Sequence, residues 1–125
     1  MTNSTTFQAE KINQHIVKWL LDYANNAKVK GFVVGISGGI DSALTSTLCA
    51  QTGLPTLCVE MPIHQAESHV NRAYEHIDQL KKRFSNVFNE RADLTPVFET
   101  FKNQVPASEN EAVLNLSLAN TRARL

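Results

Sequence analysis

The chain has 125 residues, of which 42% are hydrophobic and 19% charged, and this composition predicts a single folded domain over residues 1–125. Lysine plus arginine and aspartate plus glutamate number 12 each, a balance that argues against nucleic acid or an anionic membrane as a partner. No stretch has the length and apolarity of a membrane span, and the polar N-terminus is unlike a signal peptide, so we expect a cytoplasmic protein.

The first half of the chain predicts a helix, a strand and a second helix. The first helix runs from about Thr6 to Asn26, and its Trp19 face is expected either to pack on a sheet or to form a dimer contact. The β-branched run 32–36 predicts a strand buried on both faces. A helix from about Ser42 to Gln51 follows the glycines after this strand.

The next segment repeats the alternation of strand and helix. Residues 56–61 predict a second buried strand, and apolar residues at helical spacing over 70–84 predict an amphipathic helix. The two cysteines, Cys49 and Cys58, lie in apolar stretches outside any CxxC pair, and we expect buried free thiols. Of the four histidines only His64, in the loop after the second strand, is placed to reach a ligand at the strand ends.

The last third of the chain is less regular. Residues 86–89 are a weaker strand candidate, and Thr95 before Pro96 predicts the N-cap of a short helix. Alternating leucines favour a strand in 109–125, whereas a capping box and the absence of glycine and proline favour a helix, which we prefer. Together the elements predict an α/β fold, a doubly wound parallel sheet with helices on both faces.

A glycine-rich loop lies at the end of the first predicted strand. Gly38 and Gly39 allow close approach of an anion, and the helix that follows directs its N-terminal N–H groups to the same place. Ser37 and Ser42 add hydroxyl groups. Asp41 would repel a phosphate unless a cation lay between them, so it is the candidate Mg²⁺ ligand. The alternative is a plain glycine turn in which Asp41 or Ser42 caps the helix.

Other nucleotide motifs do not fit the loop. No lysine occurs between Lys30 and Lys81, which excludes a Walker loop, and the glycine spacing is not GxGxxG. No Ser-His-Asp arrangement can be assigned, so the catalytic residues stay unknown from the sequence.

The sequence Ser-Gly-Gly-Ile-Asp-Ser at 37–42 resembles the SGGxDS signature of the N-type ATP pyrophosphatases, which include NAD synthetase and GMP synthetase. These enzymes adenylate an oxygen of their substrate and release pyrophosphate. The resemblance implies an adenine nucleotide α-hydrolase-like fold and an Mg²⁺-ATP site. The implied ATP-binding residues are Gly35, Ile36, Ser37, Gly38, Gly39, Ile40, Asp41 and Ser42.

Two further segments resemble the ammonia-dependent NAD synthetases. Residues 120–124 are similar to the family's GN-x-K-AR-x-RM segment, which implies that Arg122 and Arg124 help hold deamido-NAD. In the stretch after the second strand, Gln65 stands near a family glutamine that contacts ATP, whereas Glu60 stands where the family often has arginine.

The resemblance implies that ATP adenylates deamido-NAD and that ammonia then displaces AMP, in a homodimeric enzyme. It covers the N-terminal half of such an enzyme, so we expect the domain to be truncated at its C-terminus. Two alternatives remain at this point. One is another N-type ATP pyrophosphatase such as GMP synthetase, and the other is a nucleotide-binding domain without catalytic activity.

Overall fold

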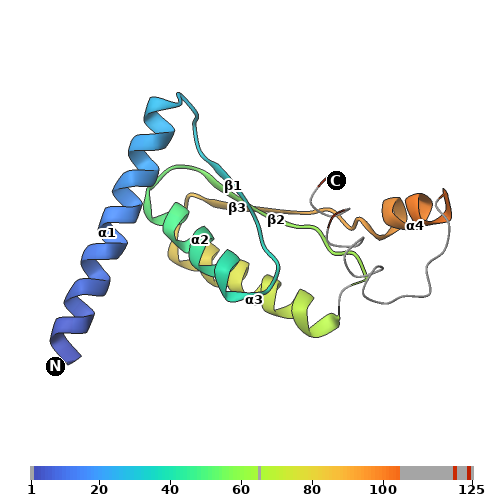
Figure 1. Cartoon of the computed structure of the whole chain (residues 1–125), viewed down its shortest axis with the longest axis horizontal. Coiled ribbons are helices and arrows are strands. Elements are labelled where there is room, and N and C mark those ends of the chain that lie inside the picture. The colour runs from blue at the N-terminus through green and yellow to red at the C-terminus, as the bar shows by residue number, and fades with distance from the viewer. Residues whose placement is uncertain (1, 65, 105–119, 121–123, 125) are drawn as a thin grey trace.

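The computed structural model describes residues 2–64, 66–104, 120 and 124. Its helices and strands alternate along the chain (Figure 1). In chain order they are α1 (Thr2–Asn26), β1 (Phe32–Gly35), α2 (Ile40–Gln51), β2 (Thr56–Glu60), α3 (Glu67–Arg83), β3 (Val87–Arg91) and α4 (Thr95–Gln104). Every element predicted within the described range is present, and α1 begins earlier than the expected Thr6. The predicted C-terminal helix over 109–125 lies almost wholly outside the described residues.

The three strands form one parallel sheet in the order β1-β2-β3. Phe32 pairs with Thr56 and Thr56 with Val87, so the strands start level and end at a common edge. Helix α2 connects β1 to β2 and α3 connects β2 to β3, so both connections cross the sheet in the same direction. Since such crossovers are right-handed, both helices lie on one face of the sheet. This arrangement confirms the predicted α/β class with a parallel sheet.

The core lies between the sheet and the two crossover helices. Ile36, Cys58 and Val87 project from the sheet toward this face and pack with buried residues of the helices, namely Ala50, Ala73, Ile77 and Leu80. Cys49 and Cys58 are buried and free, as predicted, and burial raises the pKa of both thiols.

The opposite face of the sheet is open in the described residues. Val33 is 72% exposed and Phe88, two strands away, is 54% exposed. The prediction that β1 is buried on both faces is therefore wrong. We also predicted helices on both faces of the sheet, but in the described residues helices cover one face only. Apolar composition identified the strand correctly but could not show which of its two faces α2 and α3 would cover.

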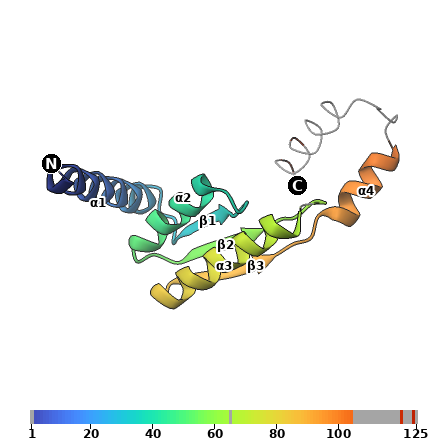
Figure 2. The same ribbon diagram turned by 90° about the horizontal axis from the view of Figure 1, so that it is seen from below.

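The two ends of the described structure are far apart, which makes the molecule elongated (Figures 1 and 2). At one end α1 packs against α2, where Asn13 Nδ2 donates a 2.6 Å hydrogen bond to Gln51 Oε1. Trp19 and Tyr23 stack on each other with ring centroids 5.2 Å apart, and both remain exposed. At the other end α4 lies beyond the carboxyl edge of the strands (Figure 1).

Candidate nucleotide site

The glycine-rich loop connects β1 to α2 at the carboxyl edge of the sheet. Gly38 has φ +89°, a conformation that disfavours any residue with a Cβ, and Gly39 is the N-cap of α2. The helix therefore begins at Ile40, two residues before the predicted Ser42, and neither Asp41 nor Ser42 caps it. By helix geometry the N–H groups of Ile40, Asp41 and Ser42 have no partner within α2. They form the donor set that an anion would meet.

The serines of the loop bond to each other and to its backbone. The Ser37 N–H donates to Ser42 Oγ over 3.1 Å, and the two hydroxyl oxygens lie 3.2 Å apart. Ser37 Oγ accepts the Gly39 N–H at 3.2 Å, and Ser42 Oγ donates to the Gly39 carbonyl at 3.3 Å. These contacts fix the turn and leave the N–H groups of the first turn of α2 available.

The first turn of α3 closes one side of the loop. A Cβ placed on Gly38 would lie 2.6 Å from the carbonyl oxygen of His69. Gly38 is therefore required twice, once for its positive φ and once for this close approach. The sequence motif indicated the first requirement, whereas the second depends on the packing of α3 and could not be predicted from the motif.

A buried hydrogen bond joins α2 and α3 behind the loop. Ser46, which is fully buried, donates to the Ser42 carbonyl at 2.7 Å and lies 2.8 Å from His76 Nε2. The Ser46 hydroxyl is also 3.0 Å from the Ala43 carbonyl. With its hydrogen directed to these backbone carbonyls, Ser46 Oγ accepts a hydrogen bond from the His76 tautomer that carries its hydrogen on Nε2. Burial, and secondarily the charge of Arg83, lower the pKa of His76. Sequence analysis missed this pair, because nothing in the local pattern relates residues on two different helices.

Asp41 lies in the first turn of α2 and is exposed. Within the described residues no group of three or more histidine, cysteine, aspartate or glutamate residues could hold a metal ion. A single carboxylate beside N–H groups that are free to bind an anion nevertheless fits Mg²⁺, which is typically held by one or two carboxylates together with phosphate oxygens and water. The arrangement suits an ion that arrives with a nucleotide.

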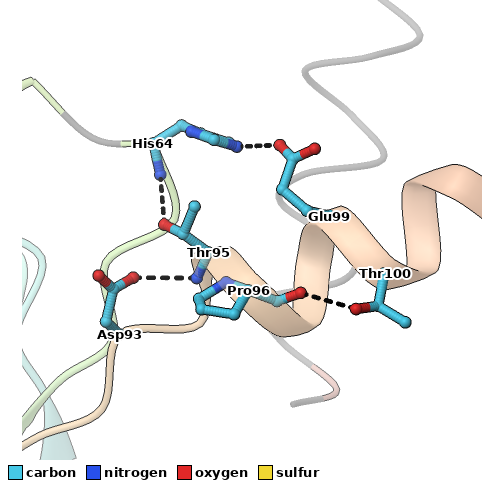
Figure 3. Close-up of polar contacts among 6 residues, drawn as sticks. All are labelled: His64, Asp93, Thr95, Pro96, Glu99 and Thr100. Carbon is cyan, nitrogen blue, oxygen red and sulfur yellow. Dashed lines mark hydrogen bonds and ion pairs between the residues drawn. The ribbon is translucent and has the colours of Figure 1, made fainter.

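The loop after β2 is fastened to α4 (Figure 3). His64, which has φ +46°, donates its N–H to Thr95 Oγ1 at 3.3 Å, and its Nε2 contacts the Glu99 carboxylate. The Thr95 N–H in turn donates to Asp93 Oδ1 at 2.9 Å. Thr95 is therefore the first residue of the helix and not its N-cap, because the upstream Asp93 supplies the capping oxygen. His64 thus joins the loop after β2 to α4, and its Nε2 already contacts the Glu99 carboxylate.

The remaining predicted residues are described only in part. Gln65 and Arg122 lie outside the described residues. Arg124 Nη1 donates to the carbonyl oxygen of Asn120 at 3.1 Å, a contact one turn back along its own segment. Residues 35–42 lie together at the end of β1 and the start of α2. The structure tests neither their contacts with ATP nor the substrate contacts of the C-terminal segment. In the described part of the chain, no helix is long and apolar enough to cross a membrane.

A parallel sheet with a glycine-rich loop leading into a helix at its carboxyl edge is an arrangement typical of nucleotide-binding α/β proteins. Residues 12–125 match the family model described as NAD synthase, and the chain belongs to this family. It is 33% identical over 117 residues to the NH₃-dependent NAD⁺ synthetase of Methanosarcina mazei, and this match covers 92% of the chain and 44% of the relative. The chain therefore spans less than half the length of this relative.

Solved structures show the same similarity. The NMN synthetase of Francisella tularensis superposes with a TM-score of 0.70 at 32% identity, covering 79% of this chain and 41% of that one. The NH₃-dependent NAD synthetase of Campylobacter jejuni superposes with a TM-score of 0.75 at 25% identity, and the match covers 92% of this chain and 47% of that one. Family membership favours NAD synthesis over the GMP synthetase alternative.

Proposed function

We propose that the protein makes NAD from deamido-NAD, using ATP to adenylate the carboxylate and ammonia as the nitrogen donor, with release of AMP and pyrophosphate. The observation that carries this proposal is the loop at 37–42, whose N–H donors and positive-φ glycine form an anion site in a chain of the NAD synthase family. The relatives named above as NH₃-dependent support ammonia as the donor. Adenylation is needed because a carboxylate is a poor electrophile and AMP is a good leaving group.

The proposed roles follow the geometry of the loop. The phosphates of ATP bind at the N-terminus of α2, where N–H groups and the helix dipole stabilise charge that develops on the leaving pyrophosphate. Gly38 has no side chain to obstruct them. The ATP-binding residues are Gly35, Ile36, Ser37, Gly38, Gly39, Ile40, Asp41 and Ser42, with Gln65 from the loop after β2. Arg122 and Arg124 bind deamido-NAD, because a guanidinium group pairs with phosphate and stacks on rings.

Magnesium is the proposed cofactor, held by Asp41 together with the phosphates. When bound, the ion supplies positive charge that offsets the charge of the pyrophosphate. We further propose that residues 1–125 form one N-type ATP pyrophosphatase domain and that the protein is a cytoplasmic homodimer. The exposed, stacked Trp19 and Tyr23 on α1 support a contact between subunits.

The test of the activity is to incubate the full chain with ATP, Mg²⁺, deamido-NAD and ammonium, and to measure NAD, AMP and pyrophosphate. We expect all three products in equal amounts. When ammonium is omitted, we expect no NAD, and no more pyrophosphate than the adenylated intermediate accounts for. Glutamine in ammonia-free buffer should not replace ammonium. NAD formed equally well from glutamine alone would refute the ammonia-dependent assignment, and ATP binding without pyrophosphate release would favour a non-catalytic nucleotide-binding domain.

A second candidate follows from the similarity to the Francisella tularensis NMN synthetase at 32% identity. This candidate reaction uses the same chemistry on a mononucleotide, so that NMN and not NAD is the product. The two substrates share the nicotinic acid carboxylate and differ by the adenylyl half of the dinucleotide. Parallel assays with deamido-NAD and with nicotinic acid mononucleotide at equal concentrations would separate them by kcat/KM.

A further inference from the structure

The end of β2 carries a buried acid that has no partner in the described part of the chain. Glu60 is only 5% exposed. It alternates with the buried Thr56 and Cys58, so its side chain lies on the face of the sheet that α2 and α3 cover. Its neighbour across the ladder is Arg91 of β3, which is exposed. Among the described residues, no hydrogen bond or ion pair involves the Glu60 carboxylate.

A buried carboxylate without a partner destabilises a folded protein, because it has lost water and gained nothing in exchange. An apolar residue of similar size would serve the core better at this position. Buried acids that stay unpaired in a free protein are typical of sites where the partner is a ligand. The group that satisfies Glu60 must be a donor, because an ionised carboxylate only accepts hydrogen bonds.

The position of Glu60 relates it to the glycine-rich loop. The Ile36 N–H donates a 2.8 Å hydrogen bond to the Val59 carbonyl, so Ser37 and Glu60 are the next residues along two adjacent strand ends. Neighbouring strands lie about 4.8 Å apart. The carboxylate thus lies one strand away from the proposed phosphate site, on the face that the first turns of α3 help to cover.

This separation suits the sugar of a nucleotide. The ribose follows the phosphates directly, and its hydroxyl groups are the nearest donors beyond them, whereas the adenine amino group lies farther away. The loop at 37–42 is not the GxGxxG loop of the dinucleotide-binding folds, but those folds show that an acid about 20 residues after a glycine-rich loop can bind ribose hydroxyls, and Glu60 follows Gly39 at a similar spacing. We propose that Glu60 accepts hydrogen bonds from the ribose hydroxyls of the bound nucleotide, an inference that rests on the proposed ATP-binding function.

The experiment compares nucleotide affinities by calorimetry on the full chain at constant Mg²⁺. ATP, 2′-deoxy-ATP, 3′-deoxy-ATP and inosine triphosphate are titrated into the wild type, Glu60→Met and Glu60→Gln. In the wild type, loss of a hydroxyl should weaken binding about 10- to 100-fold, the range for a hydrogen bond to a charged group. Glu60→Met should bind ATP and both deoxy analogues equally. Glu60→Gln keeps a neutral acceptor and should discriminate about 2- to 10-fold.

Stability supplies an independent readout. Because Glu60→Met replaces an unpaired buried charge with an apolar chain of similar size, it should raise the melting temperature of the nucleotide-free protein while lowering its affinity for ATP. Glu90→Met is the matched control, since Glu90 is an exposed acid on the neighbouring strand. This control should change neither the ratio of ATP to deoxy-ATP affinity nor the preference for ATP over inosine triphosphate.

The outcomes separate this inference from the proposed function. If the wild type binds no ATP, the proposed function fails and the ribose assignment fails with it. If the wild type binds ATP and both deoxy analogues equally, or if Glu60→Met still discriminates between them, only the ribose assignment is overturned. Glu60→Met could instead lose only the preference for ATP over inosine triphosphate and still discriminate against the deoxy analogues. This result would place the carboxylate at the adenine amino group, and it also overturns the assignment.

Discussion

Replacing Gly38 with alanine tests whether the loop depends on its contact with α3 as well as on its positive φ. The added Cβ would lie 2.6 Å from the His69 carbonyl oxygen, a backbone atom that a rotamer change cannot move. Holding a Cβ at φ +89° costs about 1–2 kcal/mol, and overpacking adds about 1–3 kcal/mol. We expect Gly38→Ala to lower the free energy of unfolding by about 2–5 kcal/mol.

Gly53→Ala is the control for this prediction. Gly53 has φ +82°, nearly the same conformation as Gly38, but no atom lies within 4 Å of the position of its added Cβ. Its replacement should therefore cost only the conformational part, about 1–2 kcal/mol. The entropy that alanine removes from the unfolded chain is the same in both variants and cancels from the comparison.

Urea unfolding of the wild type and both variants measures the difference. Gly38→Ala should be less stable than Gly53→Ala by about 1–3 kcal/mol, with an unchanged m-value. Equal stability of the two variants would refute the packing role of Gly38 and leave its conformation as the only requirement. ATP titration of the two variants then shows whether the loop geometry also matters for binding, since Gly53 lies at the far end of α2.

Three further predictions concern single side chains. Asp41→Asn should fold normally but lose most Mg²⁺-dependent pyrophosphate release, because an amide is a weaker ligand for a hard cation; unchanged turnover across a Mg²⁺ titration would contradict this. The pKa of His76 is lower in the folded protein than in the unfolded chain, so as pH falls the unfolded chain binds the proton before the folded protein does. The stabilisation that depends on neutral His76 is therefore complete above about pH 6.5, and it is lost as pH falls toward the pKa of His76 in the folded protein. His76→Gln keeps a donor for Ser46 and should flatten the melting temperature between about pH 7 and 5; an identical slope in both proteins would exclude His76 as the cause. Arg124→Ala should raise the KM for deamido-NAD about 10-fold or more while leaving that for ATP nearly unchanged, and the reverse pattern would show that the assignment is wrong.

Local patterns were sufficient to predict most of the fold. The β-branched run before Gly35 and the apolar residues of α3 at helical spacing have the period of their own element, so each could be assigned without knowledge of its neighbours. The loop at 37–42 could be predicted for the same reason, since its glycines, serines and acid are consecutive. The roles assigned to these residues stay predictions until binding is measured.

Features that depend on two distant segments could not be predicted in this way. The exposure of Val33 depends on which face α2 and α3 cover, and the start of α4 depends on an acid upstream of Thr95. The burial of Glu60 is of the same kind. Its sequence position marked it as a departure from the family, but only the sheet register and its low exposure identify it as an unpaired acid beside the loop.

The structure also indicates how the loop keeps its shape without a ligand. The hydroxyls of Ser37 and Ser42 satisfy each other and the backbone of the turn, and Ser46 donates to the Ser42 carbonyl and forms a hydrogen bond with His76 Nε2. None of these contacts uses the N–H groups of the first turn of α2. A phosphate group could therefore bind these donors without first breaking the network that orients them, and the reorganisation on binding would be small. In this chain the serines of the motif hold the loop in place, whereas the backbone N–H groups are the proposed anion site.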